Sequence, residues 1–236
     1  MPARCGTVRR HHRVCGAAFL ATILCWLWTG TAQIPEAPEK DVGMGRSLPL
    51  YMSGPASVGW WAMFITMVGD GTAFASLVFG YFFYWTIHPD FTAGLTGPGW
   101  QWPLLAMGLF MAAWAVMLGA RRLNAGGAIG SMRFSLIAAF VLALAASAAG
   151  FAGPWRHAME PTAHVYPAIV WILVIWALAH AAVGIVMQLY CLARSMAGRL
   201  TQEHDMELHN VVLYWHFMVI TAVITFAIIG LFPEAM

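Results

Sequence analysis

One apolar run limits what this chain can fold into more than any other feature, because it carries a single acidic residue near its middle. The run extends from Trp60 to Trp85, reads WWAMFITMVGDGTAFASLVFGYFFYW, and has Asp70 as its charged residue. About 20 apolar residues span a bilayer as a helix, and a carboxylate at the bilayer centre costs about 2.5–3.5 kcal/mol on insertion scales. We therefore expect a membrane-spanning helix around which a bundle packs.

The composition is that of an integral membrane protein. Of the 236 residues, 61% are hydrophobic and 9% are charged, against about 25% charged residues in soluble domains. The net charge of +2 gives no reason to expect a nucleic-acid partner. We predict an all-α fold, a polytopic transmembrane helix bundle of five helices plus one N-terminal hydrophobic helix. The apolar runs behind this prediction cover residues 14–34, 60–87, 103–120, 134–153, 166–193 and 211–232.

The chain divides into three segments by composition. Residues 1–34 comprise a basic leader and the N-terminal hydrophobic helix, residues 35–59 form a polar connector with several Pro and Gly, and residues 60–236 form the five-helix transmembrane domain. Lys and Arg in short loops mark the cytoplasmic side of a membrane protein. The loops before the second run, between the third and fourth, and between the fifth and sixth carry Lys40, Arg46, Arg121, Arg122, Arg133, Arg194 and Arg199, and the alternate loops carry Arg156. This bias predicts residues 35–59 in the cytoplasm and the C-terminus outside.

The first apolar run disagrees with this orientation, because Arg4, Arg9, Arg10 and Arg13 precede it and favour an N-terminus that lies inside. Three interpretations stay open: a signal peptide, a helix that spans against its own charge bias, and a truncated or restarted joint of a longer polypeptide. We favour the third interpretation.

Asp70 is the sharpest candidate for function, and His180 and His216 follow it. An intramembrane acid is by default a functional candidate, so Asp70 is either a proton-handling or gating group or a hydrogen-bonded structural acid. No other apolar run offers a second acid or a basic partner for it. His209 and His216 are seven residues apart, which is about 10 Å along a helix and too far to share one metal ion. His180 and His216 are either hydrogen-bonding residues or the two ligands of a haem.

Two stretches resemble subunit III of haem–copper oxidases. TMVGDGTAFASLVFGYFFYW, residues 66–85, resembles the helix of that subunit in which an acid sits mid-helix and aromatic residues follow. HDMELHNVVLYWHF, residues 204–217, resembles the entry to its last helix, with Tyr214, Trp215, His216 and Phe217 in the family's Tyr-Trp-His-Phe motif. The order of the motifs, the number of helices and the charge bias agree with the family over about residues 56–232. Residues 25–64 are similar to the joint of oxidases in which subunits I and III are fused.

The resemblance implies a subunit that binds no redox metal itself. Haem and copper would lie in the catalytic subunit I and in subunit II, and this chain would support assembly, hold phospholipid, assist proton uptake and sustain activity. It implies the cytoplasmic membrane of a bacterium as the location. Asp70 would take the place of the family's buried carboxylate, which is usually Glu. Tyr214, Trp215, His216 and Phe217 would make lipid or structural contacts.

The sequence departs from the family at three positions. Asp70 is one methylene shorter than Glu, His209 stands where an acid is common, and Val219 stands where an Asp commonly follows the motif. Three alternatives stay open beside a cytochrome c oxidase. The first is an accessory subunit of a quinol oxidase or nitric oxide reductase, and the second is a small proton-coupled transporter centred on Asp70. The third is a haem b membrane cytochrome that uses His180 and His216.

Overall fold

The structure is a computed structural model. It describes residues 58–88, 90–92, 95, 97–202 and 204–233, and it adds a few positions of the N-terminal part, namely residues 18, 21, 22, 25, 39–41, 45 and 47–49. The chain divides into two compact units, residues 1–50 and 51–236, and each is considered by itself.

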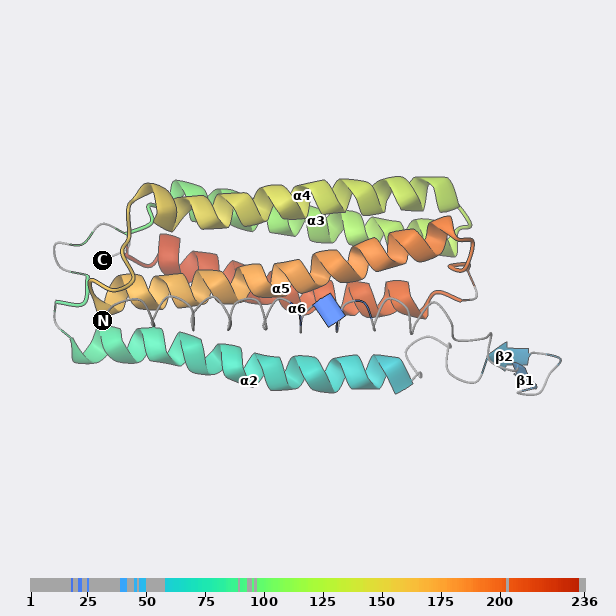
Figure 1. Ribbon diagram of the computed structural model, residues 1–236, viewed down its shortest axis with the longest axis horizontal. Coiled ribbons are helices and arrows are strands. Elements are labelled where there is room, and N and C mark those ends of the chain that lie inside the picture. Colours follow the sequence, from blue (N-terminus) through green and yellow to red (C-terminus); the bar gives the residue numbers. More distant parts are fainter. Residues whose placement is uncertain are drawn as a thin grey trace, which may run out of the picture. The chain divides into compact units, whose positions relative to one another are not determined.

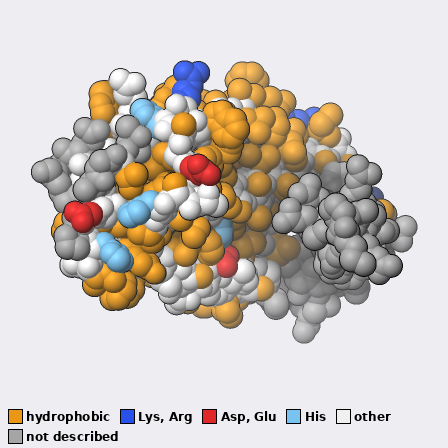
Figure 2. Space-filling model, turned by 60° about the vertical axis from the view of Figure 1, so that its left-hand side comes forward, with side chains coloured by type: hydrophobic (Ala, Val, Ile, Leu, Met, Phe, Trp, Pro, Cys, Tyr) orange, Lys and Arg blue, Asp and Glu red, His pale blue; other side chains and the backbone are white. Residues whose placement is uncertain are grey.

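Five helices of the described part are long and apolar enough to cross a membrane, so the chain is a multi-pass membrane protein. They are α2 (Val58–Ile87), α3 (Gln101–Ala125), α4 (Ile129–Arg156), α5 (Val165–Met196) and α6 (Met206–Gly230). These helices correspond to the last five predicted runs, and four of the five begin or end at least three residues beyond the apolar residues. On the face in Figure 2, hydrophobic side chains cover most of the described surface. Lipid or other protein is the fitting neighbour for such a surface.

The last helix begins at Met206, five residues before its apolar run, and Asp205 stands at its N-cap position, as the polar residues before the run indicate. Its polar first turns are paired: Glu207 binds Arg194 at 2.8 Å and His209 lies 3.1 Å from Asp205. One predicted boundary was wrong: the fourth run, predicted to end at residue 153, continues through Pro154 to Arg156 in α4. Pro154 has no N–H for a helical hydrogen bond, and the helix ends two residues after it.

Four helices form a closed ring, and the fifth packs outside it. α3 packs against α4, α4 against α5, α5 against α6, and α6 against α3, whereas α2 packs against α6 and α5 (Figure 1). The burial of the helices differs accordingly. In the most apolar stretch of α6, 61% of the residues are buried, against 11% in α2.

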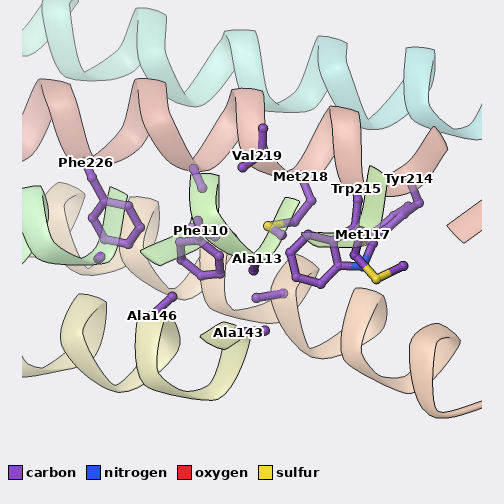
Figure 3. Close-up of a cluster of buried hydrophobic side chains, with 14 of the residues drawn as sticks. Phe110, Ala113, Met117, Ala143, Ala146, Tyr214, Trp215, Met218, Val219 and Phe226 are labelled. Atoms are coloured by element: carbon purple, nitrogen blue, oxygen red, sulfur yellow. The ribbon is translucent and has the colours of Figure 1, made fainter. Parts of the chain in front are cut away.

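Aromatic and methionine side chains of α6 fill the ring together with small residues of α4. Phe226 stacks on Phe110 of α3 with their ring centroids 6.0 Å apart, and Trp215 is fully buried. Figure 3 shows these side chains beside Ala143 and Ala146 of α4. Small residues recur at four-residue spacing in α4, as in Ala139 and Ala143 or Ala146 and Gly150, and they bring α4 close to its neighbours, as small residues do in membrane bundles.

The two ends of the ring differ in charge. The α3–α4 and α5–α6 connections lie at the same end of the ring, where two hydrogen bonds join them. The side-chain amide of Asn124 donates to the carbonyl oxygen of Thr201, and the side-chain amide of Gln202 donates to the carbonyl oxygen of Ala125. This end carries the arginines of both connections, Arg121, Arg122, Arg133, Arg194 and Arg199, and Arg156 lies at the end of α4 that faces the opposite way. Arg133 also donates to Ser195 at this end.

The N-terminal unit holds a short hairpin that the all-α prediction did not include. β1 (Glu39–Asp41) pairs antiparallel with β2 (Ser47–Pro49), with Glu39 opposite Pro49. Gly45 between them has a φ of +72°, a conformation that glycine adopts without strain. Of the predicted helix at residues 14–34, the described positions Ala18, Ala21, Thr22 and Cys25 are helical. The rest of that helix and the basic leader lie outside the described residues.

Gly150 of α4 is a position at which the packing of the ring leaves no room for a new side chain. A Cβ there would lie 2.6 Å from Cζ of Phe226, and Phe226 is held against Phe110. We expect Gly150→Ala to lower the free energy of unfolding by about 1–3 kcal/mol, as overpacked cores do. Gly108→Ala is the matched control, since a Cβ at Gly108 meets nothing within 4 Å. Thermal unfolding in detergent measures both, and equal melting temperatures would contradict the packing described here.

Candidate functional site

The site forms where α2 meets the ring, and it brings Asp70 and His180 together. Asp70 lies near the middle of α2 and His180 near the middle of α5. Oδ2 of Asp70 is 3.6 Å from Nε2 of His180, which is an ion-pair distance and longer than a hydrogen bond. The expectation that no other apolar run offers a basic partner for Asp70 was therefore wrong, because His180 of the fifth run is that partner.

One imidazole nitrogen of His180 is already committed. Nδ1 lies 2.9 Å from the carbonyl oxygen of Trp176, one turn earlier in α5. A carbonyl oxygen only accepts, so Nδ1 carries a hydrogen and donates it. The bond made by one ring nitrogen decides what the other can do, and here it turns Nε2 toward the carboxylate of Asp70.

Aromatic rings enclose the imidazole. The ring of Trp176 is 4.3 Å from that of His180, and the ring of Phe217 is 5.9 Å away. Phe74 of α2 stacks on Trp176 at 6.4 Å. The imidazole thus lies between aromatic side chains of its own helix and of α6.

The predicted last-helix motif divides between the site and the rest of the bundle. The hydroxyl of Tyr214 donates to the carbonyl oxygen of His180 at 3.0 Å, and Phe217 packs beside the imidazole and against Gly71 of α2. Trp215 points into the ring interior (Figure 3). His216 faces Trp114 of α3, with the ring centroids 5.5 Å apart. The structure thus brings Asp70 together with Tyr214 and Phe217, and it places Trp215 and His216 elsewhere.

Gly184 makes room for this arrangement. A Cβ at Gly184 would lie 3.3 Å from Cε1 of Tyr214 and 3.7 Å from Nε1 of Trp215. The absence of a side chain there lets α6 approach α5 closely, and the hydroxyl of Tyr214 then reaches the backbone of His180.

His180 and His216 contact different helices. His180 is turned toward α2 by Asp70, whereas His216 packs on α3 and donates from Nδ1 to the carbonyl oxygen of Val212 at 2.6 Å. Within the described ranges, no group of three His, Cys, Asp or Glu residues comes together in a way that could hold a metal ion.

Asp70 stays partly uncovered in the isolated chain. Its side chain is 40% exposed, while that of His180 is 13% exposed. α2 contacts the ring through a narrow stripe whose buried apolar members, Met67, Phe74 and Tyr81, are seven residues apart. Asp70 lies beside this stripe, at the border between the covered and the uncovered side of α2.

The uncovered side of α2 has a pattern of its own. Small residues recur along it at alternating four- and three-residue intervals, and they are Ala62, Thr66, Gly69, Ala73, Ser76 and Gly80. A Cβ at Gly69 or Gly80 would meet nothing within 4 Å. Large exposed hydrophobic residues flank this side, among them Ile65, Val68 and Phe79.

Sequence reasoning identified Asp70 but missed that His180 belongs to the same site. The signal available was that both residues lie near the middle of their apolar runs, and residues at one depth can meet in a bundle. That the pair would form also required α2 to pack on α5, which periodicity alone does not give.

No protein-family model matches the sequence, and a search of curated proteins gives no match. The functional interpretation therefore depends on the geometry of this site and on the motifs in the sequence.

Proposed function

We propose that this chain is subunit III of a proton-pumping haem–copper terminal oxidase, embedded in the cytoplasmic membrane of a bacterium with its C-terminus outside. In this role it supports assembly, lipid binding, proton uptake and sustained activity of the catalytic subunit. Five spanning helices, an acid in the first and Tyr-Trp-His-Phe in the last support the proposal.

The observation that carries the proposal is the position of Asp70 on an incompletely covered helix. A carboxyl group near the middle of a membrane span is expensive to expose to lipid, yet 40% of this side chain is exposed in the isolated chain. A neighbouring subunit that packs on α2 would cover it. The proposed neighbour is the catalytic subunit I, with subunit II as the second partner.

The uncovered side of α2 supports the same conclusion. Its small residues would let the backbone of a partner helix approach closely, as Gly150 and Gly184 do within this chain. The exposed hydrophobic residues around it fit either a partner helix or the acyl chains of bound phospholipid. In the proposed complex, haem and copper belong to the partner subunits, which reduce dioxygen to water, and this chain adds no redox centre of its own.

Two alternative functions are also considered. An accessory subunit of a quinol oxidase or nitric oxide reductase would use the same surface, and the electron donor of the purified complex would distinguish it. A small proton-coupled transporter is favoured by one observation, the pairing of Asp70 with His180. It requires that the chain alone drives substrate flux in liposomes and that Asp70→Asn abolishes this flux.

The proposal predicts that the chain co-purifies with a haem protein. After purification from native membranes in a mild detergent, we expect a second polypeptide whose visible spectrum shows haem a or haem b. A stable monomer that binds no such partner under these conditions would contradict the proposal.

We also expect Asp70→Ala to leave the bundle assembled and to shorten the active lifetime of the oxidase during turnover. The substitution removes the group at the subunit border, while the apolar stripe of α2 stays intact. Thr72→Ala is the matched control, because the hydroxyl of Thr72 bonds to the carbonyl oxygen of Gly69 in its own helix. Oxygen consumption followed to inactivation measures the lifetime, and identical decay in the wild type and Asp70→Ala would reject the role of Asp70.

A further inference from the structure

We propose that Asp70 and His180 form a single proton-binding site between α2 and α5. The site holds one proton, which resides either on Oδ2 of Asp70 or on Nε2 of His180. The inference deepens the proposed function by naming the partner of Asp70, but it concerns the chain alone and would stand if the oxidase assignment failed.

The hydrogen on Nδ1 determines what Nε2 of His180 can do. Because Nδ1 donates to the carbonyl oxygen of Trp176, a neutral His180 has its lone pair on Nε2. That lone pair would then face Oδ2 of Asp70 at 3.6 Å. If Asp70 were ionised as well, two acceptors would face each other without a hydrogen between them. One further proton removes this conflict.

The proton can reside on either partner, and both forms have the same net charge. On Nε2 it makes an imidazolium beside a carboxylate, and on Oδ2 it makes a carboxylic acid beside a neutral imidazole. Both forms are neutral overall, whereas the unloaded pair carries one negative charge. A net charge within an apolar span is strongly disfavoured, so the site is expected to keep its proton.

The groups that face the pair do not supply this proton. From α6, Tyr214 approaches, but its hydroxyl is donated to the carbonyl oxygen of His180. Trp176 and Phe217 present aromatic rings. In the described parts of α2, α5 and α6, no Lys or Arg lies within ion-pair distance of Asp70. The proton therefore belongs to Asp70 and His180.

His216 provides an internal comparison. It makes the same bond as His180, from Nδ1 to the carbonyl oxygen four residues earlier, and it lies in the adjoining helix. Among the described carboxylates, none lies within ion-pair distance of it. The two histidines therefore differ in the feature that matters here, which is an acid opposite Nε2.

The experiment counts protons on the full chain in lipid bilayers at neutral pH. Histidine labelled with ¹⁵N reports the hydrogen on each ring nitrogen by solid-state NMR, and infrared spectroscopy with ¹³C-carboxyl aspartate reports a protonated acid. We expect a hydrogen on Nδ1 of both His180 and His216. We also expect the occupancy of the Nε2 hydrogen of His180 and that of the Asp70 acid to sum to one. His180→Gln and Asp70→Asn assign the signals, and in Asp70→Asn the shared proton is expected to be lost.

The outcome is read from the wild-type spectra, and the two variants serve to assign the signals. One folded variant is enough for this, because replacing either residue also shifts the signal of its partner. A neutral His180 beside an ionised Asp70 would overturn the proposal. A His180 with its hydrogen on Nε2 and none on Nδ1 would overturn it as well, because the bond to Trp176 would then be absent.

Discussion

The contact between Asp70 and His180 is the interaction on which the packing of α2 depends, because an acid within an apolar span needs a partner at its own depth. His180 supplies that partner from the middle of α5. Its orientation is fixed by its own helix through Trp176, and its backbone is held by Tyr214 of α6. Three helices thus contribute to a single ionisable pair, and α2 is joined to the ring by polar as well as apolar contacts.

The remaining features of α2 follow from its place outside the ring. Helices α3 to α6 cover one another, and α6 lies at the contact of three neighbours, so its side chains form the core. α2 has two neighbours and presents its small residues away from them. A helix with an acid at the edge of its covered side and room for a close backbone on the other side suits a subunit border. For this reason we propose that a catalytic partner packs on the uncovered side of α2.

Much of the fold could be predicted from the sequence. The lengths of the hydrophobic runs indicated the five membrane-spanning helices. The start of α6 at Met206 lies outside the apolar run, and polar residues indicate it instead: Asp205 is a favoured N-cap residue and Glu207 suits the first turn of a helix. The hairpin at residues 39–49 escaped notice because three-residue strands leave little alternation to read.

The candidate site was only half predictable. Asp70 stands out as a charge in an apolar run, whereas two histidines lie in apolar runs, His180 near the middle of its run and His216 near the start. Depth favours His180 as the partner, but the side of the bundle that it faces depends on how α2, α5 and α6 pack. The Tyr-Trp-His-Phe motif forms one unit in the sequence, yet it divides in the structure. Tyr214 and Phe217 face His180, whereas Trp215 points into the ring and His216 packs on α3.

The most direct test of the account is a double-mutant cycle on the free energy of unfolding of the purified chain. Wild type, Asp70→Asn, His180→Gln and the double variant are unfolded reversibly in the same lipid–detergent mixture. Residues that act as one unit show interaction energies of about 0.5–3 kcal/mol, and we predict a value in this range, with the double variant less destabilised than the sum of the single variants. Effects that add to within about 0.3–0.5 kcal/mol would contradict the claim that Asp70 and His180 form one pair.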